Sequence, residues 1–274
     1  MKSNEYMGNE HSIQALRRSP QNDFPEHCHD FSELVLVCSG SGIHVQNDSQ
    51  KVILPNSLNV ITESDYHLYE STNNVQLMNI CYKKDSLNIS EHSSEILKEI
   101  EGKVNNITVT EKSFKQIFQT AKMLEEEQFQ NNKHSDIMAT LLFERILLQI
   151  DRLNVGDLAD NQVVRAIVFM CDNYKERDLT VACICEQFEI TPSSLNSKLI
   201  SLTGLSANKF INALRINKAK KLLVRGISVT EIAYHVGFHD SNYFSTKFKA
   251  ATGYNPSNYL SQIHFINDPN LSWE

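Results

Sequence analysis

The feature that most constrains the fold of this 274-residue chain is an internal repeat in its C-terminal part. Residues 179–210 align with residues 227–259 at a period of about 48 residues, with one extra residue in the turn of the second copy. Each copy holds a short apolar segment, a turn and a second apolar segment, both segments with helical spacing. The repeat therefore predicts two helix-turn-helix units.

Both copies carry the same signals for starting and ending a helix. Thr180 and Ser228 precede the first helix of each copy, and Thr191 and Asp240 precede the second, as expected of side chains that cap a helix N-terminus. Each second helix ends at a Thr-Gly pair, where glycine can adopt the left-handed conformation that closes a helix. The helices of the two copies are thus predicted to have matching bounds.

The stretch between the copies, residues 206–226, predicts one amphipathic helix that holds the two units at a fixed separation. Its apolar residues are expected on a buried face: Phe210, Ile211, Leu214, Ala219, Leu222 and Leu223. Its basic residues are expected to stay outside: Arg215, Lys218, Lys220, Lys221 and Arg225.

The second helix of each unit turns mostly short polar side chains away from its apolar face. Those expected to point outward are Ser193, Ser194, Asn196, Ser197 and Ile200 in the first copy, and Ser241, Asn242, Ser245, Thr246 and Lys249 in the second. Such a helix can enter the major groove of DNA, which shows a distinct donor and acceptor pattern for each base pair. The alternative is a helical interaction module with solvated faces, but two units in register, joined by a basic helix, favour DNA.

The net charge of −7 conceals an asymmetry along the chain. Residues 161–274 hold 12 Lys and Arg against 9 Asp and Glu, whereas residues 1–160 hold 14 against 24. The basic part accepts phosphates and the acidic part repels them, which suits a protein that must find one DNA site among many.

The C-terminal part resembles the AraC/XylS family of bacterial transcription regulators over residues 161–262. The stretch from 226 to 260, GISVTEIAYHVGFHDSNYFSTKFKAATGYNPSNYL, carries the resemblance. The matching residues are Gly237, Phe238, Tyr243, Phe244, Phe248, Lys249, Thr252, Gly253, Pro256 and Tyr259. The resemblance implies that the second helix of each unit enters one of two successive major-groove segments on one face of the DNA.

Matched by position, the resemblance also implies which residues contact DNA. The candidates are Ser193, Asn196, Ser197 and Lys198 in the first unit, and Ser241, Asn242, Ser245, Thr246 and Lys249 in the second. The first unit lacks an Arg on its reading helix. We therefore expect that unit to contribute mainly phosphate contacts and readout of DNA shape.

The N-terminal part predicts a small antiparallel barrel followed by helices. Between residues 24 and 82, short runs rich in Val, Ile, Leu and Tyr are separated by Gly, Asn, Asp and Pro, which is typical of strands and turns. From about residue 111 the apolar spacing becomes helical. These later helices are candidates for dimerisation, with Leu141, Leu142 and Leu148 as contacts, although the same leucines could pack on the barrel.

The stretch PEHCHDFSELVLVCSG, residues 25–40, has the spacing of a cupin metal site. His27, His29, Glu33 and the later His67 are candidate ligands for a transition metal. Ser57 stands where the metal-binding pattern usually has Gly, and a barrel joined to a DNA reader needs binding without turnover. We therefore expect neither a metal nor another cofactor. Satisfied histidines at a barrel mouth remain the structural alternative.

A sugar pocket is the preferred interpretation, because histidine, carboxylate and tyrosine side chains inside a small barrel can bind hydroxyl groups. The residues expected in it are His27, His29, Glu33, His44, His67 and Tyr69. Residues 24–48 and 66–71 resemble the sensor domains of the L-rhamnose-responsive activators of enteric bacteria. The resemblance implies L-rhamnose as the effector and dimerisation through the adjoining helices.

Together these patterns predict an α+β protein that is not an enzyme. Residues 1–153 form a cupin-like ligand-binding and dimerisation domain, 154–161 a linker, and 162–274 an all-α domain with two helix-turn-helix units. Expected partners are promoter DNA, a sugar effector, RNA polymerase and a second copy. No apolar run reaches the roughly 18 residues that span a membrane and no signal peptide is evident, so we expect a cytoplasmic protein. The alternatives are a metal-dependent cupin enzyme and a regulator that answers a non-sugar cue.

Overall fold

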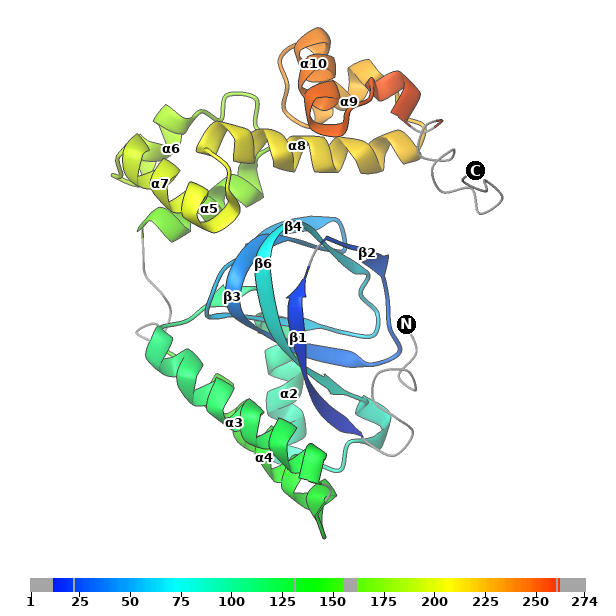
Figure 1. Ribbon diagram of the computed structural model, residues 1–274, viewed down its shortest axis with the longest axis vertical. Coiled ribbons are helices and arrows are strands. Elements are labelled where there is room, and N and C mark those ends of the chain that lie inside the picture. Colours follow the sequence, from blue (N-terminus) through cyan, green and yellow to red (C-terminus); the bar gives the residue numbers. More distant parts are fainter. Residues whose placement is uncertain (1–11, 22, 131, 155–161, 260, 262–274) are drawn as a thin grey trace. The chain divides into compact units, whose positions relative to one another are not determined.

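The computed structural model describes residues 12–21, 23–130, 132–154, 162–259 and 261. The chain divides into two compact units, Met1–Asn161 and Gln162–Glu274 (Figure 1). The linker predicted at residues 154–161 falls, from residue 155 onward, outside the described residues.

The first unit combines one antiparallel sheet with a group of helices. Its strands are β1 (Ile13–Gln21), β2 (Phe24–His27), β3 (Ser32–Gln46), β4 (Ser49–Ile53), β5 (Ser57–Ile61), β6 (His67–Tyr82) and β7 (Ile107–Thr108). Its helical elements are η1 (Lys84–Ser86), α2 (Glu91–Lys103), α3 (Glu111–Gln130) and α4 (Ser135–Asp151). The strands predicted between residues 24 and 82 are present, whereas β1 and α2 lie outside the predicted elements.

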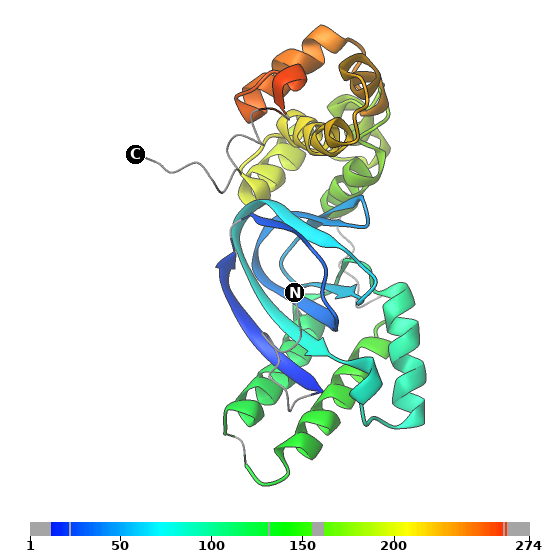
Figure 2. The same cartoon turned by 90° about the vertical axis from the view of Figure 1, so that its right-hand side faces the viewer.

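The sheet curls because its two long strands, β3 and β6, bend. The strand order is β1-β6-β3-β5-β7, β2 also pairs with β6, and β4 pairs with β3 (Figures 1 and 2). The register of β3 against β6 shifts between Val37 and Ile43. Gly40 lies in this bulge with φ +74°, and a side chain there would collide with the Asn74 carbonyl. Among the described residues the edge strands β1 and β7 do not pair with each other, so the predicted barrel is open.

Alternate residues of β3 face opposite sides of the sheet, as the pleat requires. Leu34 and Leu36 belong to the core shared with α2, α3 and α4. Val35 and Val37 belong to a second apolar cluster, inside the curl of the sheet. Glu33 follows the odd-numbered set, so its carboxyl group points away from the helices and into the barrel.

Helix α4 buries one face against this core and leaves another uncovered. Leu142 is 6% exposed and packs in the core, whereas Leu141 is 55% exposed. Leu148 is partly buried against the core. Of the two interpretations of these leucines, packing against the barrel is confirmed for Leu142, and dimer contact stays a prediction for the exposed Leu141.

In its described residues, 162–259 and 261, the second unit contains helices and no strand. Its elements are α5 (Gln162–Asn173), α6 (Val181–Gln187), α7 (Pro192–Thr203), α8 (Ala207–Val224), α9 (Val229–His235), α10 (Ser241–Thr252) and η3 (Pro256–Asn258). Within this unit, α8 runs from the group α5–α7 at one end to the pair α9 and α10 at the other (Figure 1). The predicted connecting helix is therefore confirmed.

The outer face predicted for α8 is partly wrong. Arg215 is 8% exposed and Lys218 is 7% exposed, so both side chains are buried. The Arg215 position lies between Ile211 and Ala219 at helical spacing, in the middle of the buried stripe. This spacing was the sequence signal that the charge of the side chain obscured.

Candidate functional site

The two helix-turn-helix units are built by the same local hydrogen bonds. In each of the four short helices, the capping side chain accepts from the backbone amide three residues later; these caps are Thr180, Thr191, Ser228 and Asp240. Helices α7 and α10 both end at a left-handed glycine, Gly204 with φ 72° and Gly253 with φ 82°. The predicted caps and ends are confirmed, and they give both units the same helix lengths.

Helices α7 and α10 bury their apolar residues and leave polar residues accessible. Leu195, Leu199, Phe244 and Phe248 are fully buried. Of the predicted DNA contacts, Ser193, Ser197 and Lys198 on α7, and Asn242, Thr246 and Lys249 on α10, are exposed. Ser241 and Ser245 are partly buried.

Two hydroxyl groups on α10 have a defined hydrogen-bonding polarity. Ser245 Oγ donates to the Ser241 carbonyl at 2.8 Å, and Thr246 Oγ1 donates to the Asn242 carbonyl at 3.0 Å. Because these bonds use the hydroxyl protons, the oxygens keep their lone pairs as acceptors. Amino groups of adenine and cytosine in the major groove are donors that such oxygens can bind.

Asn196 is held within the protein, unlike the other predicted contacts on α7. Its Oδ1 accepts from the Ala207 amide at 2.8 Å, and its Nδ2 donates to the Pro192 carbonyl at 2.9 Å. The side chain thereby satisfies an amide at the N-terminus of α8. This geometry conflicts with the expectation that Asn196 reads a base, and it gives Asn196 a role in fixing α7 to α8.

Sequence reasoning missed Arg215, which ties the two ends of this unit together. Its Nε donates to the Tyr174 carbonyl at 2.7 Å and its Nη2 donates to the Glu176 carbonyl at 2.9 Å. Its guanidinium group also lies 5.4 Å from the centre of the Phe238 ring, in the turn between α9 and α10.

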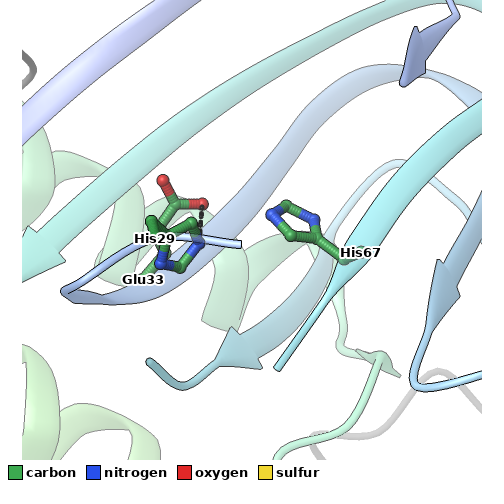
Figure 3. A group of neighbouring side chains, drawn as sticks. All are labelled: His29, Glu33 and His67. Atoms are coloured by element: carbon green, nitrogen blue, oxygen red, sulfur yellow. Dashed lines mark ion pairs between the residues drawn. The ribbon is translucent and has the colours of Figure 1, made fainter. Parts of the chain in front are cut away.

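The barrel holds a buried cluster of polar side chains from two strands and a loop. His29 precedes β3, Glu33 and His44 lie on β3, and His67 and Tyr69 lie on β6; all five are less than 6% exposed. One potential ligand atom from each of His29, Glu33 and His67 lies within 4.8 Å of the others. Figure 3 shows the His67 ring directed toward the paired His29 and Glu33.

His27, Tyr69 and His44 surround this centre. The His27 ring lies 4.2 Å from the His67 ring, and its Nδ1 donates to the Pro25 carbonyl at 2.9 Å. Tyr69 stacks on His44 with ring centres 4.8 Å apart. The six residues predicted for the pocket are therefore brought together, with His27 at the half-buried edge.

Burial controls the protonation of these groups. It lowers the pKa of His29 to about 4 and the pKa of His44 to about 3, and it holds the pKa of His67 far below its ordinary value. It raises the pKa of Glu33 to about 7. The three buried imidazoles are therefore neutral near pH 7, and each neutral ring carries a single N–H.

Several polar residues that support the cluster were not predicted. Asn79 Nδ2 donates to Glu33 Oε2 at 3.2 Å, and Asn59 Nδ2 donates to His44 Nδ1 at 3.2 Å. Both residues lie in strands whose positions the sequence indicates, but only the strand register brings them to the histidines. One signal was available, since a polar Asn59 in an apolar run requires a hydrogen-bond partner.

The first unit also contains a cavity of about 740 Å³ apart from this cluster. Ser12, Lys83, Asn88, Leu141 and Glu144 are among the residues that line it. The cavity includes none of the predicted ligand residues.

The fold and the two sites define a class of protein, a regulator in which a ligand-binding barrel accompanies a paired helix-turn-helix domain. The chain matches the sequence model of the AraC-like ligand binding domain over residues 13–147 and that of a helix-turn-helix domain over residues 184–262. It is 32% identical over 252 residues to the HTH-type transcriptional activator RhaS of Escherichia coli O157:H7, covering 89% of this chain and 90% of the relative. RhaS of Escherichia coli strain SE11 gives the same values.

The chain belongs to the AraC family of transcription regulators. Because its relatives are transcriptional activators, the alternative of a metal-dependent cupin enzyme is not retained. Among solved structures, ToxT from Vibrio cholerae O395 is similar at a TM-score of 0.32 with 19% identity, covering 91% of this chain and 96% of that chain. The family assignment rests on the sequence matches. No described helix is long and apolar enough to cross a membrane.

Proposed function

We propose that the protein activates transcription by reading promoter DNA with α7 and α10, under the control of a sugar bound in the barrel. The observation that carries this proposal is the pair of identically capped units, each with an accessible polar helix face. We assign residues 1–153 to ligand binding and dimerisation, 154–161 to a linker and 162–274 to DNA binding. The names of the relatives as activators support the direction of control.

In this proposal α7 and α10 lie in major-groove segments about one helical turn apart on one face of the duplex. Base contacts come from Ser193 and Ser197 on α7, and from Ser241, Asn242, Ser245 and Thr246 on α10. Lys198 and Lys249 contact phosphates. Most of the base discrimination falls to α10, because Asn242 can bind adenine through two hydrogen bonds and the Asn196 amide is already occupied.

The test is to select binding sites from a pool of random-sequence duplexes with the full-length protein. The selected DNA should show two conserved blocks about one helical turn apart, protected on one face in a footprint. Asn242→Ala with Thr246→Ala should abolish preference for the block read by α10, whereas the exposed Gln187→Ala on α6 should not. Selection of no conserved sequence would refute the DNA-reading proposal.

The effector part of the proposal rests on the buried polar cluster. His29 Nε2 and His67 Nε2 are buried and have no hydrogen-bond partner among the described residues. Leaving such atoms unpaired costs about 1–3 kcal/mol each, so a polar ligand that pairs with them gains affinity. L-rhamnose is the first sugar to test, because of the resemblance to L-rhamnose-responsive activators.

Calorimetry of the full-length protein against L-rhamnose and a panel of deoxy and ordinary sugars tests this assignment. His29→Ala should abolish binding of the sugar that the wild type binds, and His92→Ala, an exposed histidine on α2, should not. A cue other than sugar would be indicated if the wild type bound none of the panel.

We also propose that a second copy covers the exposed apolar residues of α3 and α4, and that the DNA-bound dimer contacts RNA polymerase. Phe129 is 85% exposed, and Ile137, Met138 and Leu141 follow on α4 with 54%, 46% and 55% exposed. An apolar group of this size is more typical of a subunit interface than of a free surface. Sedimentation of the full-length protein should show a dimer.

A further inference from the structure

A chain of hydrogen bonds leads from Asp65 to the barrel cluster. It determines which ring nitrogen of His44 and of His67 carries the proton. Gln46 Nε2 donates to Asp65 Oδ2 at 2.9 Å and to the Val60 carbonyl at 3.1 Å. Both partners can only accept, so the nitrogen of this amide must face them. Gln46 Oε1 therefore faces the other way, where Asn59 Nδ2 donates to it at 3.3 Å.

The amide of Asn59 is oriented independently from its other end. Its Oδ1 accepts from the Asn106 backbone amide at 2.9 Å, and a backbone N–H can only donate. Asn59 Nδ2 is therefore a donor, and it lies 3.2 Å from His44 Nδ1. His44 Nδ1 must accept this bond, so a neutral His44 carries its proton on Nε2.

The same logic extends one ring further. His44 Nε2 lies 3.2 Å from His67 Nδ1, and since Nε2 holds the proton, Nδ1 of His67 accepts. A neutral His67 then carries its proton on Nε2. That N–H is buried and has no acceptor among the described residues.

His29 carries its proton on the other ring nitrogen, Nδ1. Its Nδ1 lies 2.5 Å from the Phe31 carbonyl, which can only accept, so Nδ1 holds the proton and Nε2 has a free lone pair. His29 Nε2 is also buried without a hydrogen-bond partner, and it lies 3.9 Å from Glu33 Oε2. The centre thus has one donor, His67, opposite the acceptor His29 and the Glu33 carboxyl group, which accepts in its ionised form (Figure 3).

The spacing of the three groups suits one oxygen atom. Three atoms no more than 4.8 Å apart have a common centre within about 2.8 Å of each, which is a normal hydrogen-bond length. A hydroxyl group at this centre can accept from one group and donate to another. An ether or ketone oxygen could only accept, a carboxylate would be repelled by Glu33, and a metal ion requires a lone pair where His67 has a proton.

We propose that His29, Glu33 and His67 form a hydroxyl-binding triad of fixed polarity, in which a ligand hydroxyl accepts from His67 Nε2–H and donates to His29 Nε2 or Glu33. This inference rests on the proposed function of the barrel as the effector site. It adds the three groups that hold one ligand hydroxyl and the direction of each hydrogen bond, and it names Asn59 as a positioning residue that sets these directions through His44. The triad also explains why residues with the spacing of cupin metal ligands form a site that does not favour a metal, since His67 presents a proton where a metal ion needs a lone pair.

The first test measures the tautomers directly by long-range 1H–15N NMR of the full-length protein labelled at histidine. We expect the proton on Nε2 in His44 and His67, and on Nδ1 in His29. A His67 with its proton on Nδ1 would overturn the triad. This measurement needs no variant, so a folding defect cannot obscure it.

The second test moves the protons of His44 and His67 to the other ring nitrogen. Asn59→Asp replaces the donor beside His44 Nδ1 with an acceptor, which should move the proton to His44 Nδ1, then to His67 Nδ1, and leave the His67 Nε2 lone pair facing the centre. L-rhamnose, or whichever panel sugar the wild type binds, should lose about tenfold or more in affinity. Binding of Zn²⁺ should strengthen at least tenfold over wild type, because the site then offers two imidazole lone pairs and a carboxylate.

The matched control is Asn88→Asp, which makes the same change at the 740 Å³ cavity. It should leave both affinities unchanged, and circular dichroism should show both variants folded. Zn²⁺ binding to wild type as tight as to the Asn59 variant would overturn the triad. Sugar binding with His67 protonated on Nδ1 would overturn the triad and leave the proposed function standing. The tautomers could be as expected while no sugar of the panel shifts the His67 resonances. That result would overturn the sugar assignment and the hydroxyl contact together.

Discussion

Arg215 Nε donates a 2.7 Å hydrogen bond to the backbone carbonyl of Tyr174, which lies 41 residues earlier in the chain. The same guanidinium group stacks near Phe238 in the turn of the second unit. One side chain on α8 therefore connects the segment before the first helix-turn-helix unit to the turn of the second.

Removing this connection should destabilise the DNA-binding unit. Arg215→Ala removes the two hydrogen bonds that the guanidinium group donates to the Tyr174 and Glu176 carbonyls, and we expect the free energy of unfolding of this unit to fall by about 3 kcal/mol. Arg215→Lys should recover only part of the loss, because an ammonium group lacks the planar set of donors. Urea unfolding of the full-length protein, followed by circular dichroism, measures both. Lys209→Ala, exposed on the same helix, is the control, and equal losses in Arg215→Ala and Lys209→Ala would contradict the assignment.

Glycine substitutions at two turns should differ in cost. Gly237 has φ +97°, and a Cβ there would lie 2.7 Å from the Lys175 carbonyl oxygen and 3.0 Å from Arg215 Nε. Gly204 has φ +72° with no atom within 4 Å of such a Cβ. Gly204→Ala should therefore cost about 1 kcal/mol from backbone strain alone, and Gly237→Ala about 3 kcal/mol or more. Thermal unfolding distinguishes them, and a smaller shift for Gly237→Ala would show that the turn can open.

Acid should destabilise the barrel. Burial lowers the pKa of His29, His44 and His67, so protons bind more tightly to these histidines in the unfolded chain than in the folded protein. Their contribution to the free energy of unfolding is therefore fully present above the ordinary pKa of 6.5 and is lost as pH falls below it. At about pH 5.5 each lowers the free energy of unfolding by about 1.4 kcal/mol. Glu33, with its pKa raised to about 7, acts in the opposite sense and regains about 2 kcal/mol on acidification.

The expected net loss between about pH 7.5 and 5.5 is therefore about 2 kcal/mol, measured by urea unfolding at each pH. In Glu33→Gln the offset disappears, and the loss should approach about 4 kcal/mol. A wild-type protein that became more stable at about pH 5.5 would show that these histidines titrate freely.

Lys198 and Lys249 should differ from Asn242 in their effect on DNA binding. Lys249→Ala removes the proposed phosphate contact, so affinity should fall for all sequences and the slope of log affinity against log salt should decrease by about 1. Asn242→Ala should reduce discrimination by about 1–3 kcal/mol at one base pair and leave the salt slope unchanged. Titrations at several salt concentrations, with selected and scrambled duplexes, separate the two outcomes. An unchanged slope in Lys249→Ala would remove that residue from the interface.

Two adjacent leucines on α4 provide a test of the dimer. Leu142→Ala should cost about 2–5 kcal/mol of stability, because that side chain packs in the core. Leu141→Glu should leave the stability of the isolated subunit nearly unchanged and shift sedimentation toward the monomer. A dimer that persisted in Leu141→Glu would place the interface elsewhere.

The helical unit was predictable because its determinants are local. The caps at Thr180 and Asp240 and the terminal Gly204 and Gly253 act within a few residues of themselves. Strand β1 was not predictable in the same way, since its sequence IQALRRSPQ alternates weakly and it forms by pairing with β6 about 60 residues later. Arg215 was misplaced because its charge outweighed its position in the apolar stripe.

The site was predictable as a set of residues and not as a network. The spacing of His27, His29 and Glu33 located the cluster correctly, and His67 joined it through the pairing of β2 with β6. The proton positions depend on Asn59 and Gln46, whose partners are set by strand register and by the Asn106 amide 47 residues away. A spacing rule cannot distinguish a metal centre from a hydroxyl site, because both use the same side chains in different tautomers.

Helix α8 is a single segment of 18 residues, about 27 Å long, with no break between the two units that it joins. An inserted or deleted residue in it would rotate one unit by about 100° about the axis relative to the other. In the proposed DNA-binding mode, the length and stiffness of α8 thus fix the distance between the two DNA blocks. In the proposed DNA-binding mode, a further promoter must therefore present its two blocks at this same spacing.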